Sequence, residues 1–130
     1  MGRNISEAIG RGFGPEQAIA VKTDAVATGI TAAGSTIADA FQLDTGISIV
    51  ETAASGTGVL LPNAETGETV VVQNLGANDL EVYPPTSSQA INGAAGGTAL
   101  TLAAATNVIG VFYKISATTW AAFVVAGPVT

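Results

Sequence analysis

The chain contains no cysteine and no histidine among its 130 residues. Without cysteine it can form neither a disulfide framework nor a thiolate metal site. Without histidine it lacks the usual general base near neutral pH, the commonest metal ligand and the base of the Ser-His and Cys-His nucleophile pairs. An enzyme built from this chain would have to use Asp, Glu, Lys, Tyr or Ser alone. We therefore expect that the protein is not an enzyme, that none of its residues forms a metal site and that it binds no cofactor; whether an ion lies on the axis of an oligomer stays open.

Basic residues are also scarce, since four Lys and Arg stand against ten Asp and Glu, for a net charge of -6. Nucleic-acid binding and docking on anionic lipid both depend on clustered Lys and Arg, so we expect neither nucleic acid nor membrane as a partner. No apolar run approaches the ~18 residues of a membrane span. The first residues lack the apolar core of a secretory signal. We expect a protein that stays in the cytoplasm until it assembles.

Charge is nearly absent from the C-terminal part of the chain. Glu81 is the last acidic residue, and Lys114 is the only charged residue between positions 82 and 130. A small soluble domain normally keeps its exposed surface charged, because charge prevents association. We interpret the uncharged stretch as surface that is covered by further copies of the chain or by a larger assembly.

Residues 1–22 differ from the rest of the chain. Asn4 and Glu7 have the spacing of a capping box, and Ile5 and Ile9 fall on one face of a helix of one or two turns. Glycines and a proline follow directly and end this pattern. The sequence therefore predicts an N-terminal arm with a short helix.

Two motifs are compatible with ligand binding, but each has a simpler explanation. Residues 10–14 read Gly-Arg-Gly-Phe-Gly, as in a phosphate-binding loop, but Pro15 follows them and no buried strand precedes them. Asp79 and Glu81 are two apart on an expected strand and so share one face. A Ca²⁺ ion needs about six to eight oxygen ligands. We interpret the first motif as part of the arm and the second as a solvated strand face.

The remainder, residues 23–130, has a β pattern throughout. Short apolar or alternating runs are separated by Gly, Pro and Asn, and Asn92-Gly93 is a strong tight-turn pair. This pattern predicts an all-β protein with a single β-sandwich or jelly-roll-like domain. One expected strand, residues 18–21, lies at the end of the arm. Within residues 23–130 the expected strands are 37–43, 47–53, 59–61, 70–75, 80–83, 100–102, 108–115 and 120–125.

The aromatic residues of the second half are the candidates for subunit contacts. Aromatic side chains in a small β domain lie mostly in the core or in subunit interfaces. An exposed platform that stacks on sugars is the alternative. The subunit-interface candidates are Tyr83, Phe112, Tyr113, Trp120 and Phe123.

Several short segments, in their order and spacing, resemble small β-structured capsid decoration (cement) and head-fibre proteins of tailed bacteriophages. Together they extend over residues 30–123. The segments are residues 32–40, 58–62 (GVLLP), 67–74 (GETVVVQN), 80–85 (LEVYPP), 91–93 (ING) and 119–120 (TW).

The resemblance implies a structural virion protein, made in the host cytoplasm and placed on the outer capsid surface. It implies a homotrimer on a local symmetry axis that bridges neighbouring subunits of the major capsid protein, and it brings no catalytic residues. The alternative is a head-fibre or tail-fibre module that binds host glycan through Trp120 and the tyrosines. The arm would grip the shell, with capsid-contact candidates Arg3, Ile5, Ile9, Arg11 and Phe13.

Overall fold

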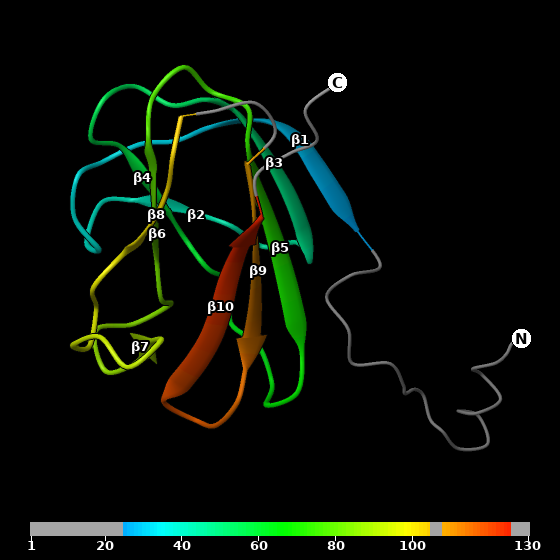
Figure 1. Cartoon of the computed structure of the whole chain (residues 1–130), viewed down its shortest axis with the longest axis vertical. Helices are drawn as coiled ribbons and strands as arrows, with labels where there is room; N and C mark the ends of the chain where they lie inside the picture. Colours follow the sequence, from blue (N-terminus) through cyan, green and yellow to red (C-terminus); the bar gives the residue numbers. More distant parts are fainter. Residues whose placement is uncertain (1–24, 105–107, 126–130) are drawn as a thin grey trace, which may run out of the picture.

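A computed structural model describes residues 25–104 and 108–125, which form two β-sheets and no helix. The expected all-β class is thus confirmed, while the predicted arm and the strand expected at residues 18–21 lie outside the described residues. One sheet contains, in spatial order, β1 (Val26–Thr31), β3 (Ile47–Thr52), β5 (Thr69–Asn74), β9 (Val108–Lys114), β10 (Thr119–Val125) and β7 (Ala90–Ile91) (Figure 1). The other contains β2 (Phe41–Gln42), β4 (Gly58–Leu60), β6 (Leu80–Tyr83) and β8 (Leu100–Leu102).

The first six strands alternate between the two sheets. β1, β3 and β5 are parallel neighbours in the six-stranded sheet, and β2, β4 and β6 are parallel neighbours in the four-stranded sheet. Parallel neighbours need a long connection, and here each connection passes through the opposite sheet. This parallel winding was not predicted, and it differs from the antiparallel strand order of a Greek key.

The strands β8, β9 and β10 add antiparallel pairs to the two sheets. β9 and β10 form a hairpin, β9 also pairs with β5, and β8 pairs with β6. β7 runs parallel to β10 at the outer edge of the six-stranded sheet. The predicted turn directly after β7 is confirmed, because Asn92 and Gly93 have φ angles of 56° and 76°.

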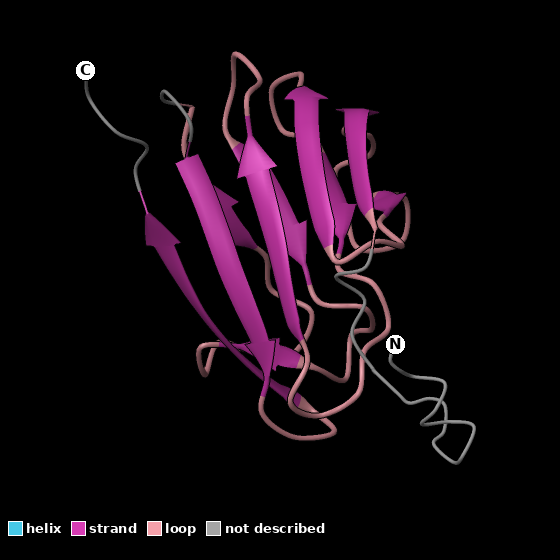
Figure 2. Ribbon diagram, turned by 90° about the vertical axis from the view of Figure 1, so that its right-hand side faces the viewer, coloured by secondary structure: helices cyan, strands magenta, loops and turns pink. Residues whose placement is uncertain are grey.

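One hydrophobic core lies between the two sheets, which stand beside each other in Figure 1. Figure 2 looks onto the broad face of the six-stranded sheet. In β5 the side chains alternate: Val70 and Val72 are fully buried, whereas Val71 and Gln73 are half-buried on the other side of the strand. The four-stranded sheet contributes its own buried side chains to the same cluster. The fully buried apolar residues on the strands are Val50, Val59, Val70, Val72, Leu80, Val82, Leu102, Phe112 and Trp120.

The strand expected at residues 37–43 is reduced to the two residues of β2. The segment before it forms a turn, because the Asp39 carboxylate accepts hydrogen bonds from the Thr36 backbone N–H at 2.8 Å, from its hydroxyl at 2.9 Å and from the Ser35 N–H at 3.0 Å. The hydrogen bonds from Thr36 are the main cause that lowers the pKa of Asp39 below its usual 3.8. β1 was missed because its sequence, VATGIT, mixes Gly and Thr with few large apolar residues.

Candidate functional site

The outer face of the six-stranded sheet is apolar over five strands. Residues paired directly across a sheet point to the same side, so the strand register defines rows of side chains on this face. We call the apolar members of three such rows the apolar face. The first row is Val26, Ile47, Val71, Val111 and Phe123; the second is Ile49, Gln73, Ile109 and Val125; the third is Thr69, Tyr113 and Ala121.

Charge is almost excluded from this face. Of the eight charged side chains in residues 25–104 and 108–125, only Glu51 and Lys114 lie on strands of the six-stranded sheet. Of these two, Glu51 lies on the outer side, one step beyond Ile49 near the end of β3. Its carboxylate accepts a hydrogen bond from the Gly29 N–H at 3.2 Å and so stays at the edge next to β1. Lys114 points to the opposite side, where its Nζ donates to the Ala64 carbonyl at 3.0 Å and lies 5.9 Å from the centre of the Trp120 ring.

An aromatic pair stands at the β9–β10 end of the apolar face. The rings of Tyr113 and Phe123 pack edge to face with their centroids 6.1 Å apart. Their side chains are 41% and 47% exposed. Such aromatic pairs are favourable contacts, and large exposed aromatics of this kind are enriched at protein interfaces.

The outer face of the four-stranded sheet has the opposite character. Thr101 donates to the Glu81 carboxylate at 2.9 Å, and the Tyr83 hydroxyl donates to the Ser35 carbonyl at 3.0 Å. Burial, together with the charges of Glu81 and Asp39, raises the pKa of Tyr83 above its usual 10.0. The two outer faces therefore offer different surfaces to a partner, one apolar and one polar.

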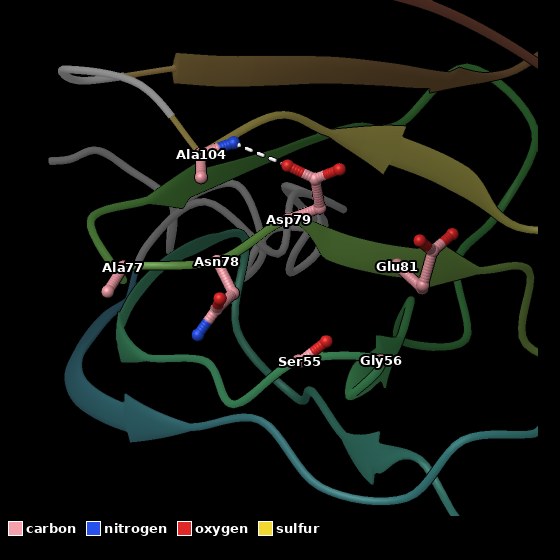
Figure 3. A pocket seen from close by; sticks show the side chains of 7 residues that line it. All are labelled: Ser55, Gly56, Ala77, Asn78, Asp79, Glu81 and Ala104. Carbon is pink, nitrogen blue, oxygen red and sulfur yellow. Dashed lines mark hydrogen bonds between the residues drawn. The ribbon is translucent and has the colours of Figure 1, made fainter.

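A shallow pocket of about 410 Å³ lies next to the polar face (Figure 3). Asp79 and Glu81, which the sequence predicted to share one strand face, both line it. One Asp79 carboxylate oxygen accepts a hydrogen bond from the Ala104 N–H at 2.8 Å. Within the described part of the chain, no cluster of three or more Asp or Glu side chains could hold a metal ion. The pocket thus offers two carboxylates together with the Ser55 hydroxyl and the Asn78 side-chain amide.

Two of the five aromatic interface candidates are corrected by the structure. Phe112 and Trp120 are fully buried in the core of the chain itself, so they have no surface to offer to another subunit. The Trp120 indole N–H donates to the Gln89 side-chain oxygen at 2.7 Å inside the protein. Both residues face inward because their positions in β9 and β10 pair directly with other inward positions.

The other three candidates lie on different faces. Tyr113 and Phe123 lie together on the apolar face, and Tyr83 lies half-buried on the polar face. Trp120 cannot stack on a sugar at the surface, as the glycan-binding alternative requires, because its side chain is fully buried. The capsid-contact candidates Arg3, Ile5, Ile9, Arg11 and Phe13 lie outside the described residues.

The aliphatic residues of the apolar face were not among the named interface candidates. A signal for it was present: the runs Val70-Val71-Val72 and Val108–Lys114 are apolar at both odd and even positions. Strands with one solvated face alternate, whereas strands covered on both faces read as continuous apolar runs. These runs are typical of strands that have apolar side chains on both faces.

Comparisons with protein-family models, with curated proteins and with solved structures found no match to this chain. The described residues form no helix that is long and apolar enough to cross a membrane.

Proposed function

We propose that this protein is a structural subunit that works by binding other protein subunits, and that it decorates and stabilises a bacteriophage capsid as a homotrimer. The observation that supports the assembly role is the apolar face, which leaves Val26, Tyr113, Phe123 and Val125 exposed on one side of a sheet. Contiguous exposed apolar surface of this extent marks interaction sites. The phage assignment comes from the resemblance of the sequence segments.

The proposed mechanism is mass action. A protein that binds the assembled shell, but not its separated parts, stabilises the shell in proportion to its binding. Several modest contacts repeated around a symmetry axis add through avidity, so no single contact has to be strong. The subunit would bridge neighbouring copies of the major capsid protein on the outer surface of the virion.

The proposal assigns separate tasks to the two parts of the chain. The two sheets share one core and would act as a sandwich-type body that presents the apolar face. The arm would contact the capsid through Arg3, Ile5, Ile9, Arg11 and Phe13. Three of the four basic residues of the chain precede residue 25, in contrast to the acidic body.

The test uses purified capsids of the cognate phage and the protein with and without residues 1–15. The full chain should bind capsids saturably and raise the temperature at which they disassemble. The shortened chain should keep its oligomeric state but lose capsid binding. Saturable binding by the shortened chain would contradict the role of the arm. Lack of binding by the full chain would contradict the decoration function.

A further inference from the structure

We propose that the apolar face is the surface through which copies of this chain pack against one another. This inference rests on the proposed structural role and deepens it, because it names the occupant of the exposed sheet face. Three observations on the described residues support a second copy over other occupants: the distribution of charge, the size of the face and its position at the β10 edge.

The distribution of charge favours a self-contact. The described part of the chain has seven acidic side chains and one lysine, and Glu51 is the one acid among them that lies on a strand of the six-stranded sheet. Two copies meet with equal charge, so acids at their contact would repel each other across a desolvated gap. A basic partner would instead gain from acids placed at the contact. Exclusion of acids from the face is therefore the pattern that a self-contact requires.

The N-terminal segment of the same chain is a poorer match to the face. Residues 1–24 contain six of the fourteen charged residues, and burying these against an uncharged sheet would leave them without partners. The face itself offers them only Glu51, which already accepts from Gly29. The apolar face of another copy could pack on this face without burying unpaired charges.

The size of the face suits a stable contact. With strands ~4.8 Å apart and residues on one face ~6.7 Å apart along each strand, each position covers about 32 Å². The twelve positions of the three rows therefore cover about 390 Å². A typical specific interface buries about 800 Å² per partner, so the three rows supply about half of one. Leu75 and Ile115, both exposed, extend the apolar surface beyond the three rows.

The face reaches the edge of the sheet at β10. β7 pairs with β10 only at Thr119 and Trp120, and Phe123 to Val125 have no strand beside them on that edge within the described residues. An apolar edge that nothing covers invites association. Packing of a second copy over the β9–β10 end would cover both the aromatic pair and this edge.

The test compares charge substitutions on the two sheets in the full-length chain. Phe123→Glu and Tyr113→Glu place a carboxylate on the apolar face, whereas Phe41→Glu places one at a 42% exposed phenylalanine of the other sheet. Sedimentation velocity from low to high micromolar protein should show a wild-type oligomer. The two face variants should dissociate at least about a hundredfold more readily, since an unpaired charge would be buried. Phe41→Glu should assemble like the wild type.

A second measurement does not depend on introduced charge. Because the chain has no cysteine, Phe123→Cys and Phe41→Cys each give a single reporter thiol. The thiol from Phe123→Cys should react slowly with a maleimide at high protein concentration and quickly on dilution. The thiol from Phe41→Cys should react at one rate throughout. Equal concentration-independent rates at both positions would overturn the inference, even where a Glu variant fails to fold.

The outcomes separate this inference from the proposed function. A wild-type chain that stays monomeric, or face variants that assemble like the wild type, would overturn the self-contact. Phe123→Glu that assembles but no longer binds capsids would overturn it in favour of the capsid as occupant, and the decoration role would stand. Assembly through the face without any capsid binding would support the self-contact and contradict decoration.

Discussion

The side-chain amide of Asn92 continues the β-sheet where β7 ends. Its Nδ2 donates to the Ala122 carbonyl at 2.9 Å, and its Oδ1 accepts from the Ala122 N–H at 2.8 Å. In a continued parallel ladder, the backbone of β7 would supply these two hydrogen bonds from two different residues. Asn92 can reach them because it adopts a positive φ of 56°, which Asn tolerates better than most residues. A turn residue thus satisfies part of the exposed edge of β10.

Replacing Asn92 tests this relationship. Asn92→Gly keeps access to the positive φ but removes both hydrogen bonds, which should cost about 1–3 kcal/mol of unfolding free energy. For a body of this size each kcal/mol lowers the melting temperature by about 4–8 °C. Thermal unfolding followed by circular dichroism measures the change. Asn63→Gly, at an exposed loop position, serves as the control. A melting temperature equal to that of the control would show that the pair contributes nothing.

The buried pair of Trp120 and Gln89 should contribute strongly to stability. Trp120→Phe removes the indole N–H and leaves the Gln89 oxygen buried without this donor, in addition to lost core volume. We expect a loss of about 2–4 kcal/mol. Urea unfolding of Trp120→Phe, Gln89→Leu and the double variant gives the coupling between them. The double variant should lose less than the sum of the two single changes, and strict additivity would contradict the coupling.

Gly58 tests the parallel pairing of β4 and β6. A Cβ at this position would lie 2.6 Å from the Glu81 carbonyl oxygen and 2.8 Å from Cε2 of the Tyr83 ring. Because the nearest atom belongs to the backbone of the paired strand, Gly58→Ala should destabilise the protein by about 1–3 kcal/mol. Ser55→Ala, an exposed change in the preceding loop, should leave unfolding in urea nearly unchanged. Equal stability of both variants would contradict the close approach of the two strands.

Asp39 should make stability dependent on acid pH. Hydrogen bonds from Thr36 are the main cause that lowers its folded pKa below 3.8. The carboxylate therefore stabilises the fold above that pH, and this stabilisation is lost as the pH falls through the lower folded value. Asp39→Asn should be less stable than the wild type near neutral pH, and the difference should shrink below about pH 4. Melting curves from pH 2 to 7 measure it; a constant difference would contradict this role.

Local signals in the sequence predicted several elements well. β6 and β8 have the predicted bounds, residues 80–83 and 100–102. A double proline follows Tyr83 and cannot continue a strand, so this end was visible in the sequence. The Asn92-Gly93 turn was predicted because both residues tolerate positive φ.

Other features depend on which segments meet in space, and no local pattern contains that information. The parallel neighbours β1, β3 and β5 are separated in sequence by a strand of the opposite sheet, so their pairing could not be predicted from adjacent segments. β7 has only two residues and is defined by its contact with β10. The side on which each aromatic lies depends on strand register, because a shift by one residue exchanges the two faces.

The amino-acid sequence by itself determined that this protein is all-β and that its second half is nearly free of charge. It also excluded any chemistry that needs cysteine or histidine, because the chain contains neither. These properties follow from composition and local alternation. Only the tertiary structure decided which uncharged residues are core and which are surface. It buried Phe112 and Trp120 and left Tyr113 and Phe123 exposed, because alternate residues of a strand point to opposite sides and one side already has the second sheet against it.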